Sequence, residues 1–240
     1  MRTLPSRPAA GRRRRRRAAV LTAAAVLTAV AAAGTGEFAA RGLIRDRVLA
    51  AAPALGGDPV IHPGGSALWD LLDRRIPRLD VSSDDARVGP LSHASVRARL
   101  DGVDLGGGTA RVAGSHAEVT VPVASIGAAV QDAVSSMPVG AVTADPASGT
   151  VVVALGRGGI GRLTLRPTVD GGRVSFPVAE LTLLGRAVPP ERLGPAAGGL
   201  GPADGPQRPY PLGLRATSAA VLADGVRITL DGGAAELAAP

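Results

Sequence analysis

The alternation of apolar and polar residues that begins at Leu79 constrains the fold of this 240-residue chain more than any other feature. It is clear in residues 79–82 and 96–100, and it resumes after a change of phase at Gly102. Successive side chains of a β-strand point to opposite faces, so this period predicts strands with one buried and one solvated face. The change of phase is typical of a β-bulge, which adds one residue to a strand. We therefore predict an α+β domain that is mainly β.

Turn sequences predict two hairpins in the second half of the chain. Residues 163–169 are expected to pair with residues 174–178 across Asp170-Gly171-Gly172, because Asp and Gly favour the tight turns of hairpins. Residues 214–222 are expected to pair with residues 226–230 across Ala223-Asp224-Gly225. The same periodicities place further strands at residues 119–123 and 150–155, and helices at residues 37–55, 67–72 and 125–134.

The first 36 residues combine a basic run with an uncharged, apolar segment. Eight Arg and no acidic residue lie in residues 1–17, and residues 18–36 carry no charge. A helix of that length spans about 28 Å, close to the ~30 Å hydrocarbon core of a bilayer. We predict a basic cytoplasmic leader at residues 1–17, followed at 18–36 by a transmembrane anchor or, since Ala31-Ala32-Ala33 offers a cleavage site, by a signal segment.

Either interpretation of the N-terminal segment sends the rest of the chain out of the cytoplasm. An anchor gives a single-pass protein of the cell membrane with its C-terminal domain outside, and a cleaved signal gives a protein secreted to the envelope. Residues 37–240 are then the exported domain. Residues 189–211, which are rich in Pro and Gly, are expected to form a loop within it.

Composition excludes several classes of function. All 27 basic residues are Arg, and beyond residue 17 the remaining 19 Arg accompany 20 acidic residues, so the excess positive charge is confined to the leader. A body close to neutral argues against nucleic acid as a partner. The absence of Cys excludes disulfides and thiolate metal sites, and four aromatic residues are too few for stacking on bases or sugars. We expect no cofactor.

Two sequence patterns resemble ligand-binding motifs but have simpler explanations. Residues 156–161 satisfy G-x-G-x-x-G, yet the residues that follow alternate and include Pro167, so no helix can begin there to hold a pyrophosphate. His116 and Glu118 share one face of a predicted strand, with His93 as a remote third candidate; a solvated polar face explains them better than a metal site. We expect no catalytic residue and no metal site, and hence no enzyme.

The predicted strand faces are made of Val, Leu, Ile and Ala, with almost no aromatic residues. Such faces pack against the protein's own helices as an ordinary core, or they curve around a groove that holds acyl chains. The residues alone favour the ordinary core, and the location next to a membrane favours lipid.

Four segments occur in a recognisable order between residues 39 and 230. They are an amphipathic helix at residues 41–52, Gly64-Gly65 followed by residues 66–82, the Leu-x-Gly-Val core of residues 91–105, and Tyr-Pro-Leu-Gly-Leu-Arg at 210–215 before the last hairpin. In this order the chain resembles the actinobacterial LmeA-like phospholipid-binding family of exported envelope proteins.

The resemblance implies an elongated, curved antiparallel sheet wrapped around a helix, similar to tubular lipid-binding folds. It also implies that phospholipid or glycolipid acyl chains lie in an apolar groove, and that the role is non-enzymatic, in envelope lipid or lipoglycan maintenance. The alternative from another class is an envelope scaffold with an ordinary filled core that binds a protein partner, of unknown identity, through an exposed strand edge.

Candidate site residues divide into a lining and a rim. Arg97 and Arg99 are candidates for the rim, because guanidinium suits the phosphate of a head group; a solvated strand face would explain them as well. The candidates for the apolar lining, each of which would fit an ordinary core equally well, are Leu43, Trp69, Leu72, Val121, Ile126 and Phe176.

Overall fold

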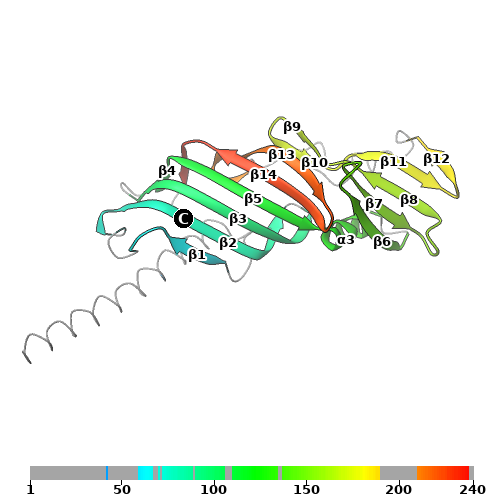
Figure 1. Cartoon of the computed structure of the whole chain (residues 1–240), viewed down its shortest axis with the longest axis horizontal. Coiled ribbons are helices and arrows are strands. Elements are labelled where there is room, and N and C mark those ends of the chain that lie inside the picture. Colours follow the sequence, from blue (N-terminus) through cyan, green and yellow to red (C-terminus); the bar gives the residue numbers. More distant parts are fainter. Residues whose placement is uncertain are drawn as a thin grey trace, which may run out of the picture.

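The structure is a computed structural model that describes Gly42, Asp70 and residues 59–66, 72–88, 90–105, 110–134, 137–189 and 210–237. Two curved antiparallel sheets lie end to end along the long axis of the molecule, and the helix α3 (Val123–Ala133) lies where they meet (Figure 1). The prediction of a mainly β fold is confirmed.

The larger of the two sheets, which we call the main sheet, has eight strands and antiparallel pairing throughout. Six strands follow the order β1-β2-β3-β5-β14-β13, and the short strands β4 and β15 pair with each other beside the end of β3. The strands are β1 (Val60–Pro63), β2 (Arg75–Val88), β3 (Leu91–Asp104), β4 (Ala110–Val112), β5 (Gly114–Pro122), β13 (Arg215–Leu222), β14 (Gly225–Gly232) and β15 (Ala235–Leu237).

The longest strands, β2 and β3, form a hairpin of 14 residues on each side. Gly102 of β3 has a φ of 61°, in the left-handed region that glycine adopts most easily. As a result Leu100 and Val103, three positions apart, are both buried on the same face. The predicted change of phase at Gly102 is confirmed.

The second sheet follows the order β12-β11-β8-β7-β6, again antiparallel. The predicted strand at residues 150–155 is β7, and the glycine-rich residues 156–160 form the turn that joins it to β8. Another strand follows that turn, which confirms the interpretation of the G-x-G-x-x-G pattern as a turn. The strands are β6 (Val139–Asp145), β7 (Thr150–Leu155), β8 (Gly161–Leu165), β11 (Val178–Leu183) and β12 (Arg186–Val188).

Both predicted hairpins are present. β9 (Thr168–Asp170) and β10 (Arg173–Ser175) are joined by Gly171 and Gly172, whose φ values of 56° and 81° give the left-handed turn that matches strand twist. In the last hairpin Leu222 pairs with Gly225 across a two-residue turn.

Helix α3 begins at Val123, two residues before the predicted helix, so the preceding strand ends at Pro122 and not at residue 123. The helix packs closely on β6, because a Cβ at Gly127 would lie 2.7 Å from Val142 Cγ2. It also contacts β3 and β5, and it therefore closes one end of the main sheet.

Several predictions fall mainly outside the described residues. The leader at 1–17, the segment at 18–36 and most of the loop at 189–211 lie outside them, as does the helix at 37–55 except for Gly42, which is helical. Of the helix at 67–72, Asp70 and Leu72 are described and are helical, with the Asp70 amide donating to the Ser66 carbonyl at 2.9 Å. In the described part of the chain no helix is long and apolar enough to span a membrane. The wrapping of the sheet around a helix remains a prediction.

Candidate functional site

The main sheet has one continuous apolar face, which we call the inner face. Residues that pair across antiparallel strands share a face, so the strand register defines its rows. One row contains Val81, Ala98, Ala117, Leu230 and Ala216. The next contains Ser83, Val96, Val119, Ile228 and Ala219. Neither row carries a charged side chain, so the face can contact hydrocarbon without burying a charge.

Buried side chains on the inner face form two clusters. The larger continues onto α3 and the second sheet, which follow at that end of the main sheet. The smaller lies at the opposite end of β3 and consists of Ile76, Leu79, Val81, Leu100, Val103 and Val112. Its half-buried neighbours include Ile61 of β1 and Leu212 of the 3₁₀-helix η4 (Pro211–Gly213), and Ala98 borders both clusters. Among the described elements, the close neighbours of β2 are β1 and β3, which lie beside it in the sheet.

Ser115 places a hydroxyl where the two clusters meet. It pairs in register with Leu100 of the smaller cluster, and Ala117, the next inner-face residue of β5, belongs to the larger. The residue is 7% exposed, and within the described part of the chain its Oγ has no hydrogen-bond partner. Gly232 on the neighbouring strand leaves room for this hydroxyl, because a Cβ there would collide with Ser115 Oγ. A buried hydroxyl without a partner costs about 1–3 kcal/mol, which an oxygen of a ligand can recover.

Ser115 was not among the site residues expected from the sequence. The available signal was its position in the alternation of β5, where Ala117, Val119 and Val121 occupy the same phase and Ser115 alone is polar. A polar residue in an apolar phase has to find a partner or remain unpaired, which makes it a candidate contact for a ligand.

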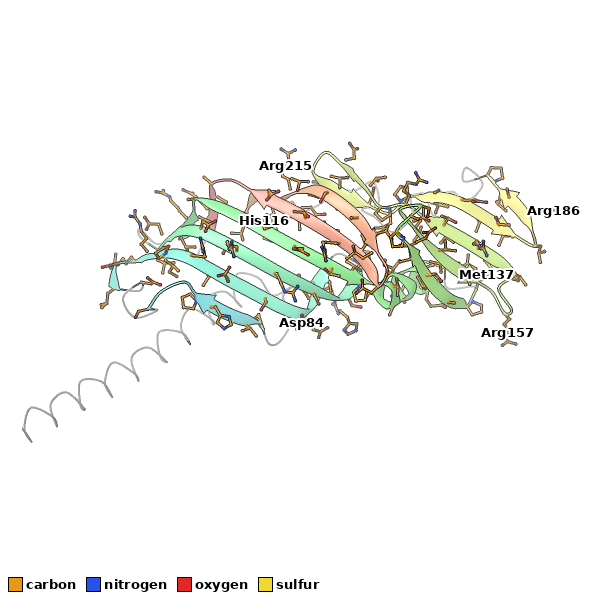
Figure 2. All side chains as sticks on the ribbon, in the orientation of Figure 1. Asp84, His116, Met137, Arg157, Arg186 and Arg215 are labelled. Atoms are coloured by element: carbon orange, nitrogen blue, oxygen red, sulfur yellow. The ribbon has the colours of Figure 1, made fainter. Side chains whose placement is uncertain are left out.

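The opposite, outer face of the main sheet carries a ladder of charges. The register places Asp80, Arg99, His116 and Asp231 in one row, and His116 is labelled in Figure 2. Arg99 Nε donates to Asp80 Oδ1 at 3.1 Å, and His116 Nδ1 lies 2.6 Å from Asp231 Oδ1. The hydrogen bonds from His116 and then from Thr217 hold the pKa of the Asp231 carboxyl below its ordinary value of 3.8.

The second row of the outer face contains Arg97 and Glu118, with Glu118 bonded to Arg227 Nε at 2.7 Å. All of these side chains are substantially exposed, and the interpretation of His116 and Glu118 as a solvated polar face is confirmed. His93 is bonded instead to Asp85, at 2.6 Å. Within the described residues, no group of three or more His, Cys, Asp or Glu is placed to hold a metal ion.

The candidate site residues from the sequence occupy different environments. Arg97 and Arg99 lie on the outer face, on the opposite side of β3 from the apolar clusters, and their role in head-group binding stays a prediction. Leu72 is 65% exposed, whereas Val121, Ile126 and Phe176 are buried together in the larger cluster. Leu43 and Trp69 lie outside the described residues.

The fold and the inner face together define a class: a curved, mainly β protein with an uncharged aliphatic sheet face, on which the Ser115 hydroxyl has no partner among the described residues. A family model described as LmeA-like phospholipid-binding matches residues 31–231. The chain therefore belongs to the LmeA-like phospholipid-binding family, which is a lipid-binding family and not an enzyme family. No curated protein and no solved structure matches the chain.

Proposed function

We propose that the chain binds the acyl chains of a phospholipid or glycolipid in an apolar groove along the inner face of the main sheet, without catalysing a reaction. The observation that carries this proposal is the uncharged inner face, which continues away from α3 and the second sheet to the smaller cluster. Membership of a phospholipid-binding family supports it. We further propose that the protein acts in the cell envelope, in lipid or lipoglycan maintenance, carried there by residues 18–36 as an anchor or signal.

Burial of hydrocarbon supplies the affinity in this proposal. Each CH₂ removed from water contributes about 0.8 kcal/mol, so a dozen contribute on the order of 10 kcal/mol before the cost of ordering the lipid. Ala98, Ala117 and Ala216 are the small side chains of one inner-face row, and in our proposal an acyl chain lies along this row.

Ser115 gives the groove a polar contact. We assign its hydroxyl as a donor to an ester carbonyl oxygen of the bound lipid, because that oxygen accepts a hydrogen bond and lies at the base of the acyl chains. The hydroxyl then fixes how far the chains extend into each of the two clusters.

Substitution Ser115→Ala tests this contact without disturbing the packing around it. We expect the variant to unfold at the same or a higher temperature than the parent, because an unpaired buried hydroxyl is removed. We expect its affinity for a phospholipid with a fluorescent acyl chain to fall about fivefold, the value of one hydrogen bond of about 1 kcal/mol. The measurement is equilibrium titration of the full chain with the labelled phospholipid. The matched control is Ser218→Ala, at an exposed position of β13.

An unchanged affinity in Ser115→Ala would overturn the assignment of the carbonyl contact. Failure of the parent chain itself to bind the labelled phospholipid would overturn the groove. A stable protein complex that survives delipidation would favour the envelope scaffold instead.

A further inference from the structure

The second sheet ends in two turns that lie side by side, and together they form what we call the tip: residues 156–160 between β7 and β8, and Leu184-Gly185 between β11 and β12. The Leu184 amide donates to the Ile160 carbonyl at 2.8 Å, so the two turns are held together. Figure 2 shows Arg157 and Arg186 at this end of the molecule, which is the end away from β1 in Figure 1.

Two large aliphatic side chains are exposed at the tip. Leu184 is 78% exposed, more than any other large hydrophobic residue in the described part of the chain, and Ile160 is 49% exposed. Exposed aliphatic residues scattered singly on a surface are ordinary, but these two lie on turns that are hydrogen-bonded to each other at one extremity.

The backbone conformation of Leu184 makes its presence there unfavourable for folding. Leu183 pairs with Arg186, so Leu184 and Gly185 form a two-residue hairpin turn, with φ values of 50° and 74°. Such a turn favours Asn, Asp or Gly at its first position, and a leucine in the left-handed region is strained. Since Leu184 is neither buried nor suited to the turn, neither the core nor the turn accounts for it.

Three arginines lie in or next to the two turns. Arg157, Arg162 and Arg186 are exposed, and within the described residues none of them forms an ion pair. The acidic residues of this sheet lie further away. Glu180 is four positions before Leu184 on β11, where its carboxylate accepts a hydrogen bond from Thr182. Asp145, the last residue of β6, pairs with Thr150 at the end of β7 away from the tip.

We propose that the tip docks on the surface of an anionic phospholipid bilayer, with Leu184 and Ile160 entering the boundary between head groups and acyl chains. Arg157, Arg162 and Arg186 then face the phosphates, which match their charge and the geometry of guanidinium. This inference goes beyond the proposed function, because it requires a membrane surface and a different part of the molecule from the inner face.

A fluorescent probe beside the tip tests docking in the full chain. It reports on the surroundings of the tip itself, and not on binding by the N-terminal segment. The chain has no cysteine, so Ala187→Cys gives one labelling site for an environment-sensitive NBD group next to the tip. We expect its emission to rise and shift to the blue with vesicles containing phosphatidylglycerol, and to change little with vesicles of phosphatidylcholine alone. The matched probe is Leu72→Cys, at an exposed position in another part of the molecule, where we expect no change.

Substitutions at the tip distinguish the contribution of the inserted Leu184 side chain from that of the arginine charge. Leu184→Asn, which suits the turn, is expected to raise the vesicle concentration needed for half the signal by about tenfold. Arg186→Gln is expected to raise it about fivefold. No signal at residue 187, an equal signal at residue 72, or an unchanged titration in Leu184→Asn would each overturn the proposal. Ser115→Ala is expected to leave the signal unchanged, so that failure of the inner-face groove and failure of the tip can be distinguished.

Discussion

Leu184 and Asp231 are two single residues with opposite expected effects on the stability of the folded protein. Leu184 keeps a strained backbone conformation with its side chain in solvent. Asp231 lies in the charged ladder of the outer face, where His116 and Thr217 both donate to its carboxylate. For each of them we predict the effect of a single substitution on the free energy of unfolding.

Replacing Leu184 by Asn should stabilise the isolated protein. A left-handed conformation costs an ordinary L-residue about 1–2 kcal/mol, and Asn tolerates it better than Leu. We expect the free energy of unfolding to rise by about 0.5–1 kcal/mol, as measured by urea denaturation. Leu72→Asn is the control at an exposed position without that backbone strain, and a loss of stability in Leu184→Asn would contradict the account.

Asp231→Asn should lower stability in a pH-dependent way. Because the hydrogen bond from His116 lowers the pKa of Asp231 in the folded state, the unfolded chain binds a proton at this carboxyl more readily than the folded chain does. The contribution of Asp231 to stability is therefore present above about pH 4 and is lost as the pH falls through the lowered pKa. Denaturation at pH 7 and pH 3 measures this, and an equal difference between the two proteins at both values would contradict it.

At the scale of elements, turn residues and apolar spacing were enough to predict the hairpins and α3. They were not enough to predict which distant strands pair. Gly171-Gly172 dictates the β9–β10 turn by itself, and apolar spacing fixes α3 to within two residues. The separation of strands into two sheets, and the pairing of β14 with β5, depend on contacts between residues distant in the sequence. Alternation alone predicts that Val121 lies on a buried face and that Arg97 and Arg99 lie on the solvated face of their strand.

Helix α3 owes its position to its apolar face, and Ile126 is the test of that packing. Ile126 is fully buried in the larger cluster. Truncation to Ala in a packed core costs about 2–5 kcal/mol, so we expect Ile126→Ala to lower the free energy of unfolding by that amount in urea denaturation. Ala128→Ser, on the exposed side of the same helix, is the control. A loss below about 1 kcal/mol would contradict the packing described.

At the scale of the whole molecule, the elongated arrangement separates three surfaces with different chemistry. The outer face of the main sheet is charged and solvated, the inner face is aliphatic, and the tip of the second sheet is apolar with surrounding arginines. In our proposals, this member of a phospholipid-binding family has one surface for hydrocarbon and a second for a membrane.

Native mass spectrometry of the full chain, purified without added lipid, tests the central claim most directly. Ala98 borders both clusters on the inner face, so Ala98→Phe fills the proposed groove without changing the N-terminal segment. Ala220→Phe, on the exposed side of β13, is the matched control. We predict one bound phospholipid or glycolipid in the parent and in Ala220→Phe, and none in folded Ala98→Phe. A lipid-free parent, or equal lipid in all three proteins, would contradict the account.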